Sequence, residues 1–173
     1  MNLNQVRIRE EVAADKAAVY RINYEAFGRR EEADLVDSVR ATAESFLSLV
    51  AVLDGAPVGH ILFSPVEVSA ESDDTSAVGL GPVAVLPDHQ RMGVGSRLIE
   101  VGLERCRQNG DGVVFVLGHQ DYYPRFGFLP AAEGDLFYKN HDFDPYFFLI
   151  ELVPGAAAKL AGEVRYLPAF DEA

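Results

Sequence analysis

Short runs of alternating or continuous apolar residues in the first half of the chain predict strands. Residues 6–10 alternate apolar and charged side chains, which is the pattern of a half-buried strand. Residues 48–53 form an apolar run that ends at Asp54-Gly55, and this pair predicts a hairpin turn to a returning strand over residues 57–68. Proline cannot donate to a sheet ladder, so we expect that strand to be interrupted at Pro65.

Helical spacing of apolar residues predicts three helices. Residues 13–28 and 31–43 carry apolar side chains three and four positions apart. A third helix is expected over residues 93–109, where an Asn-Gly pair gives a C-terminal stop signal. It lies between expected strands over residues 77–85 and 113–117, and a strand, a crossover helix and a second strand make a parallel unit.

The remaining segments predict shorter elements around this unit. They are a hairpin loop over residues 70–76, a short helix over 121–126, strands over 128–130, 146–153 and 164–167, and a polar loop over 131–144. The length suits one domain, and the chain has no internal repeat or linker of biased composition. Residues 1–173 are therefore interpreted as a single α/β domain.

The segment from Gly79 to Ser96 organises the chain, because it joins the strand over residues 77–85 to the helix that follows. Pro87 ends the strand, and Gly93 and Gly95 leave the backbone uncovered where the helix begins. The first N–H groups of a helix have no intrahelical partners and favour a negative charge. The segment is therefore a candidate phosphate cradle; the alternative is an ordinary turn in which glycine only permits tight packing.

Two motifs of this chain resemble the GNAT superfamily of acyl-CoA N-acyltransferases. The segment Gln90-Arg91-Met92-Gly93-Val94-Gly95 follows a strand that ends in Val-Ala-Val, and it is similar to the superfamily's pyrophosphate loop. Tyr123-Pro124-Arg125-Phe126-Gly127-Phe128 is similar to the Tyr-x-x-x-Gly-Phe signature. The run over residues 118–128 and Glu-Leu-Val-Pro-Gly-Ala at 151–156 further resemble the YhbS-like branch of predicted acetyltransferases. The resemblance implies the GNAT fold, a mixed central sheet with splayed strands and flanking helices.

The resemblance also implies which residues bind acetyl-CoA, the acyl donor. The backbone at the end of the strand is expected to pair with the pantetheine amides, and an N–H near Val85 to polarise the thioester carbonyl. The N–H groups from Arg91 to Ser96 are expected to bind the pyrophosphate. The expected cofactor-binding residues are Val83, Ala84, Val85, Gln90, Arg91, Met92, Gly93, Val94, Gly95 and Ser96.

Tyr123 is the candidate general acid for the departing thiolate, because it lies four residues before Gly127, as the signature tyrosine does. A phenol with an ordinary pKa of about 10 suits this role. Tyr122 is the neighbouring alternative. The alternative without a catalytic role is that Tyr123 is a half-buried aromatic residue that only packs beside Phe126 and Phe128.

The general base stays open at this point. Glu25, Glu31, Glu67, His119 and a water chain are the candidates. His119 is attractive because it directly follows a buried strand and histidine titrates near neutrality, although a strand-end histidine bonded to the backbone explains it as well. Glu25 and Glu31 are also candidate substrate-binding residues, since their region forms one wall of the substrate cleft in the resembled fold.

The net charge of the chain limits the classes of partner that we expect it to bind. The 173 residues carry a formal net charge of −12, which argues against general binding to nucleic acid or to an anionic membrane surface. Arginines 91, 97, 105 and 107 still cluster around the expected cofactor helix and offer a local positive field to the polyanionic CoA. The acidic balance favours a small cationic amine or a basic peptide as the acceptor.

The numbers and spacing of cysteine and histidine residues indicate the cellular compartment and whether a metal site is expected. Cys106 is the one cysteine, so no disulfide can form within the chain, and this favours a cytoplasmic protein. Cys106 lies on the apolar side of an expected helix, which indicates a packing role. No apolar run approaches the roughly 18 residues that span a bilayer. His60 is interpreted as packing and His89 as solvated, and the histidines form no metal-ligand spacing, so no metal is expected.

Together these observations predict an N-acetyltransferase that moves an acetyl group from acetyl-CoA directly to a primary amine, without a covalent acyl-enzyme. A non-catalytic acyl-CoA-binding or regulatory module on the same fold is the alternative, and an interaction domain that does not bind CoA is a third. The aromatic run Tyr146-Phe147-Phe148 offers surface for a homodimer, and a core role explains it equally well.

Overall fold

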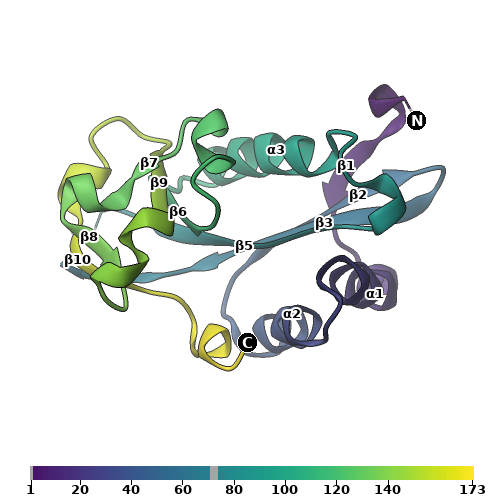
Figure 1. Ribbon diagram of the computed structural model, residues 1–173, viewed down its shortest axis with the longest axis horizontal. Helices are drawn as coiled ribbons and strands as arrows, with labels where there is room; N and C mark the ends of the chain where they lie inside the picture. Colours follow the sequence, from purple (N-terminus) through teal and green to yellow (C-terminus); the bar gives the residue numbers. More distant parts are fainter. Residues whose placement is uncertain (1, 71–73) are drawn as a thin grey trace. The chain divides into compact units, whose positions relative to one another are not determined.

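The computed structural model describes residues 2–70 and 74–173, which form an α/β architecture of three α-helices and two sheets (Figure 1). One sheet has seven strands in the order β1-β2-β3-β5-β6-β9-β7, and the other has three in the order β4-β10-β8. No helix among the described residues is both long enough and apolar enough to cross a membrane.

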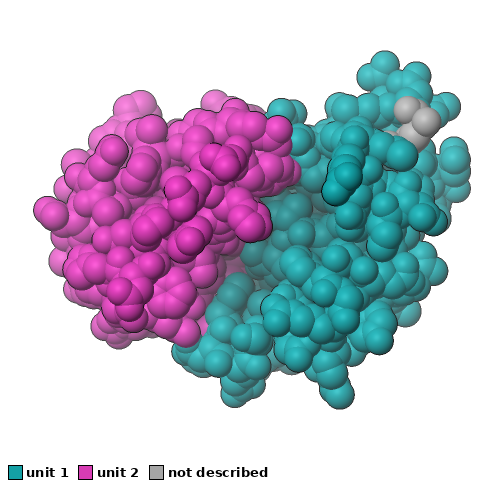
Figure 2. Space-filling view, viewed as in Figure 1, with its two compact units in different colours: residues 1–63, 81–102, 168–173 teal, residues 64–80, 103–167 magenta. Residues whose placement is uncertain are grey.

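The chain divides into two compact units, each built from segments that are separated in sequence (Figure 2). The first unit holds residues 1–63, 81–102 and 168–173, and the second holds residues 64–80 and 103–167. Because the segments alternate along the chain, neither unit is a continuous stretch of sequence. The single domain expected over residues 1–173 stays a prediction.

An antiparallel meander forms the sheet of the first unit. β1 (Arg7–Glu10) pairs with β2 (Leu47–Leu53), and β2 pairs with β3 (Ala56–Pro65). Asp54 and Gly55 both adopt positive φ values, 50° and 81°, in the turn between β2 and β3. These values suit the tight hairpin turn that the sequence predicted there.

Two amphipathic helices follow the predicted pattern in the first unit. α1 (Lys16–Phe27) ends at Gly28, whose left-handed backbone (φ 70°) lets its N–H bond the Tyr24 carbonyl. α2 (Glu31–Thr42) has three acidic residues in its first turn and Arg40 in its last, which suits the helix dipole. The buried apolar residues of the two helices are Val19 and Ile22 in α1 and Ala33, Leu35, Val36 and Val39 in α2.

Two glycines let α3 (Val94–Gln108) lie directly against β3. A Cβ atom at Gly59 of β3 would lie 3.0 Å from the side chain of Leu98, closer than most packed side chains allow. A Cβ atom at Gly102 of α3 would lie 2.5 Å from the Phe63 ring, which is inside contact distance. Gly102 therefore permits the close packing of helix on sheet.

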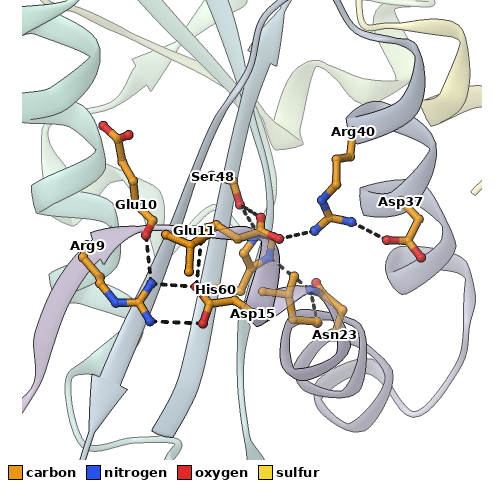
Figure 3. Close-up of polar contacts among 11 residues, drawn as sticks. Arg9, Glu10, Glu11, Asp15, Asn23, Asp37, Arg40, Ser48 and His60 are labelled. Carbon is orange, nitrogen blue, oxygen red and sulfur yellow. Dashed lines mark hydrogen bonds and ion pairs between the residues drawn. The ribbon is translucent and has the colours of Figure 1, made fainter. Parts of the chain in front are cut away.

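A chain of hydrogen bonds joins buried polar groups between β3 and α1 (Figure 3). The Asn23 amide donates one hydrogen to the Val19 carbonyl at 3.0 Å and the other to His60 Nδ1, also at 3.0 Å. Because Nδ1 accepts this bond, His60 is neutral and carries its proton on Nε2, which donates to Ser48 Oγ at 2.8 Å. His60 is fully buried, which confirms its interpretation as a packing residue.

The chain continues from β2 to α2. Ser48 donates to the Glu11 carboxylate, which also pairs with Arg40, and Arg40 in turn contacts Asp37 (Figure 3). The side chains of Glu11 and Arg40 are only 7% and 13% exposed, so this charge pair is held largely out of water. Burial, with a smaller contribution from the positive charge of Arg40, lowers the pKa of His60 to about 3.

The second unit contains the parallel pair that the sequence predicted. Residues 77–80 of β5 (Ala77–Val85) pair in parallel with β6 (Val113–Leu117), and the rest of β5 lies beyond this register. β6 pairs antiparallel with β9 (Phe147–Glu151), which pairs antiparallel with β7 (Leu129–Pro130). The first four residues of β6 are buried, as its continuous apolar run predicted.

A three-stranded sheet in the second unit corrects two expectations. β4 (Glu67–Ala70) pairs antiparallel with β10 (Ala161–Arg165), and β10 pairs parallel with β8 (Leu136–Tyr138). The strand expected over residues 57–68 is interrupted near Pro65, as predicted, but its continuation belongs to this other sheet. The polar loop expected over 131–144 contains β8.

The shorter elements differ from their expected bounds. β9 is shorter than expected because Tyr146 belongs to the preceding 3₁₀ turn, and β10 begins three residues before the expected strand at 164. The short helix expected over 121–126 is a 3₁₀ turn over Tyr123–Phe126. The hairpin loop expected over 70–76 lies partly outside the described residues. Phe115 and Phe147 stack at 5.5 Å within a buried apolar cluster of this unit, which supports a core role for Phe147.

The buried histidine predicts a pH dependence of folding. The His60 pKa is about 3 in the folded protein and about 6.5 when unfolded, so the unfolded chain binds more protons between these values. This contribution to stability is complete above pH 6.5 and is lost as the pH falls toward 3. His60→Gln keeps one acceptor and one donor but does not titrate.

Between pH 6 and 4.5, wild type should lose about 2 kcal/mol more unfolding free energy than His60→Gln, measured by urea denaturation. The other ionisable groups are the same in the two proteins, so their contributions cancel in the difference. Equal pH slopes in the two proteins would contradict the neutral, buried state of His60.

Candidate functional site

The residues expected to bind acetyl-CoA all lie in the first unit, at the end of β5 and in the turn to α3. Val83 and Val85 are half-buried, and Ala84 is buried. Gln90 Nε2 donates to the Val85 carbonyl at 2.9 Å and so ties the turn to the end of the strand. This bond uses the Gln90 side chain as a local support, which its place in the motif did not reveal.

The turn has an unusual backbone on both sides of Met92. Arg91 and Gly93 adopt positive φ values of 59° and 87°. Alternation between right-handed and left-handed conformations turns successive N–H groups toward one side, which makes a concave anion site. Among the described residues, the N–H groups from Arg91 to Ser96 have no main-chain acceptor, whereas the Arg97 N–H bonds the Gly93 carbonyl at 3.0 Å. These free donors fit a phosphate group.

Side chains beside the turn add unpaired polar atoms. Arg97 is half-buried, and its Nε is buried without a hydrogen-bond partner among the residues the structure describes. His89 was expected to be solvated, but it is half-buried and its Nδ1 is buried with no partner in the described part of the chain. The sequence singled out Arg97 only as a member of an arginine cluster and gave no signal for His89. A buried guanidinium donor fits an anionic ligand at this turn.

Glu25 and Glu31, the candidate substrate-binding residues, lie in different surroundings in the first unit. Glu25 pairs with Arg21 at 3.5 Å on the exposed surface of α1. Glu31 is the first residue of α2, and its Oε2 is buried without a partner among residues 2–70 and 74–173. Its neighbour Glu32 is bonded to Arg29. Glu31 therefore has an acceptor available for a cationic group, whereas the nearby acids are already paired.

Tyr123 begins a 3₁₀ turn in the second unit that ends at Gly127, which has a φ of 96°. Its ring meets those of Tyr122 and Phe128 edge to face, with centroids 5.1 and 5.7 Å away. Burial, with a smaller effect of Tyr122, raises the pKa of the Tyr123 phenol. The hydroxyl is therefore protonated throughout the physiological pH range, as a proton donor must be before it acts.

The candidate bases of the second unit are both exposed. His119 follows β6 and is exposed, and its carbonyl accepts the Tyr122 N–H at 3.2 Å. Glu67 is exposed in β4. Their exposure does not distinguish these two residues from the two glutamates of the first unit or from water as the base.

Two expectations concern chemistry outside the site. Cys106 is buried, with 1% exposure, and burial raises the pKa of its thiol, which confirms the packing interpretation. Across the described residues, no group of three or more His, Cys, Asp or Glu side chains could hold a metal ion.

The expected site residues thus form two sets. The expected cofactor residues, Glu25 and Glu31 all lie in the first unit. Tyr123 and His119 lie close in sequence in the second unit, where the Tyr122 N–H links the turn back to His119.

Comparison with known proteins identifies the family and the fold of this chain. Residues 7–131 match the family model described as an acetyltransferase (GNAT) domain. The uncharacterized N-acetyltransferase YjhQ of Escherichia coli K12 is 46% identical over 121 residues, covering 69% of this chain and 67% of the relative. The uncharacterized N-acetyltransferase YhbS of the same strain is 32% identical over 160 residues, covering 92% and 95%.

Two solved structures share the fold. The crystal structure of YhbS from Escherichia coli in complex with CoA superposes with a TM-score of 0.89 at 30% identity, covering 96% of this chain and 92% of that one. A GNAT family acetyltransferase from Brucella melitensis in complex with acetyl-CoA has a TM-score of 0.78 at 35% identity, covering 96% and 98%. The α/β fold expected from the sequence is confirmed. With its donor turn, its fold and a family model that spans most of its length, this chain belongs to the GNAT family of acetyltransferases.

Proposed function

We propose that this protein transfers an acetyl group from acetyl-CoA directly to a primary amine of a small molecule or peptide. The observation that carries the proposal is the row of N–H groups from Arg91 to Ser96, which have no main-chain acceptor among the described residues. Such donors at a helix start suit the pyrophosphate of CoA. Two relatives that share the fold hold CoA and acetyl-CoA.

The reaction needs one bond to form and one to break. The neutral amine attacks the thioester carbonyl, a C–N bond forms, and the C–S bond breaks to release CoA. One proton leaves the amine nitrogen and one reaches the departing sulfur. We assign the second proton to Tyr123, because it lies four residues before Gly127, as the signature tyrosine does, and a phenol is neutral at physiological pH.

The acceptor is proposed to be cationic before it reacts. Glu31 supports this, because its buried Oε2 has no partner in the described part of the chain and a carboxylate in that state attracts an ammonium group. Glu25 is a second acceptor-binding candidate at the surface. Because an ammonium group loses one proton before it attacks and a second as the amide forms, His119 or a water chain is proposed to carry both to solvent. Homodimer formation stays a prediction.

A bulky residue in the turn should separate binding from folding. In Gly95→Val, side-chain atoms at the start of α3 obstruct a ligand on the N–H groups. We expect at least a tenfold loss of acetyl-CoA affinity, about 1.4 kcal/mol, by titration calorimetry. Gly134→Val is the control, because the nearest atom to a Cβ there is 3.8 Å away. If Gly95→Val loses as much unfolding free energy as binding free energy, the turn is only structural. If the wild-type protein does not bind acetyl-CoA, the proposal is wrong.

Removing the Tyr123 hydroxyl should slow turnover without affecting binding. We expect Tyr123→Phe to lower kcat by about 10²-fold or more in an assay of CoA release, because a positioned general acid is lost. The acetyl-CoA affinity should stay within about twofold. Tyr122→Phe is the matched control and should keep its kcat. Wild type that binds acetyl-CoA but acetylates no amine in a broad panel would instead support a non-catalytic module.

Neutralising Glu31 should affect the acceptor and not the donor. In Glu31→Gln, we expect KM for a cationic amine to rise about tenfold, as a charge-assisted contact worth about 1.5 kcal/mol is lost, while KM for acetyl-CoA is unchanged. Glu32→Gln is the control, because Glu32 is already bonded to Arg29. A rise in KM for both substrates in Glu31→Gln would place this residue outside the acceptor site.

A further inference from the structure

Gly118 directly follows β6 and has no room for a side chain. A Cβ atom built there would lie 2.2 Å from Tyr123 Cε2, 2.8 Å from Cδ2 and 3.3 Å from Cζ. The Gly118 N–H donates to the Tyr146 carbonyl at 2.8 Å, so the backbone is fixed at this point. Real Cβ atoms do not approach other atoms so closely, and a methyl group at this position would displace the Tyr123 ring.

The need for glycine at position 118 is steric and not conformational. Its φ lies outside the left-handed region, so alanine can adopt the same backbone. Gly127, at the other side of the 3₁₀ turn, differs in this respect, because its φ of 96° explains glycine there. The three atoms nearest to a Cβ at Gly118 all belong to the ring of Tyr123.

Two aromatic rings also contact the ring of Tyr123. Phe128 is buried and meets the ring edge to face, and Tyr122 does the same from another side. Tyr122 is itself held, because Arg125 lies over its ring at 4.6 Å and donates from Nε to its carbonyl at 3.3 Å. The Tyr123 ring therefore cannot yield to a methyl group at 118 without moving its hydroxyl.

We propose that Gly118 is a positioning residue for catalysis, which sets the place of the Tyr123 hydroxyl by letting the ring rest on the backbone at the end of β6. This inference rests on the proposed role of Tyr123 as general acid. A displacement of about 1 Å in a catalytic group can lower a rate by about 10²-fold. Gly118 touches no reacting atom in this proposal and acts through Tyr123 alone.

A double-mutant cycle tests the proposal. We expect Gly118→Ala to lower kcat by about 10- to 100-fold, with the acetyl-CoA affinity kept within about twofold by calorimetry. In the Tyr123→Phe background the same substitution should change kcat by less than about twofold, because there is no hydroxyl left to misplace. Gly134→Ala is the matched control, since a Cβ there meets nothing closer than 3.8 Å.

Each outcome bears on a different claim. If Gly118→Ala keeps the wild-type kcat, or lowers it equally with and without the Tyr123 hydroxyl, Gly118 is not a positioning residue for Tyr123. If Tyr123→Phe keeps the wild-type kcat, the general-acid assignment fails. In that case a crystal structure of Gly118→Ala decides the geometry separately: an unmoved Tyr123 ring would overturn the steric argument, and a displaced ring would support it.

Discussion

The close approach of α3 to β3 is the constraint on which the first unit depends. Gly59 on the strand and Gly102 on the helix remove the side chains that would hold the two elements apart. The start of α3 is therefore fixed relative to the sheet, and with it the turn that follows β5. If α3 lay further from β3, the free N–H groups at its start would move away from the end of β5. The position of these donors therefore depends on the packing of α3 as much as on the glycines within the turn.

The opposite face of β3 is organised by polar contacts. His60, Ser48 and Glu11 link the sheet to Asn23 of α1 and Arg40 of α2. His60 and Ser48 each donate and accept, and the Glu11 carboxylate accepts from both Ser48 and Arg40, so the loss of one member leaves a neighbour buried without a partner. One strand thus presents a tightly packed face to α3 and a directional, hydrogen-bonded face to α1 and α2. The second arrangement fixes how the helices that carry Glu25 and Glu31 are seated on the sheet.

Sequence reasoning succeeded where the signal was local. Pro87 marks the end of β5, and the Asn109-Gly110 pair marks the end of α3. The candidate cofactor turn could be named from sequence because its residues are contiguous, and its role stays a prediction. Sequence reasoning failed for β8, a strand of three residues whose partner β10 lies more than twenty positions further along the chain, so no local pattern reports the pairing. It also joined β4 to β3, because an apolar run does not show that the chain changes sheets.

The residues of the candidate site also differ in whether a local sequence pattern identifies them. The donor turn and Tyr123 have short motifs, but a general base has none, because its role depends on which carboxylate or imidazole lies near the amine in three dimensions. His89 and Gly118 were missed for a related reason. The burial of the His89 ring nitrogen and the contact of Gly118 with the Tyr123 ring result from tertiary packing. The residues next to them in sequence do not predict either feature.

The interleaved segments of the two units have a consequence for how the chain folds. Residues 1–63 and 81–102 contain most of the first unit, yet the 3₁₀ turn Pro168–Asp171 that packs against α2 follows the whole of the second unit in sequence. Contacts that link such distant residues close long loops, which slows folding more than it affects the final stability. During synthesis the ribosome must therefore release nearly all of these residues before the first unit is complete, and until then α2 lacks part of its cover.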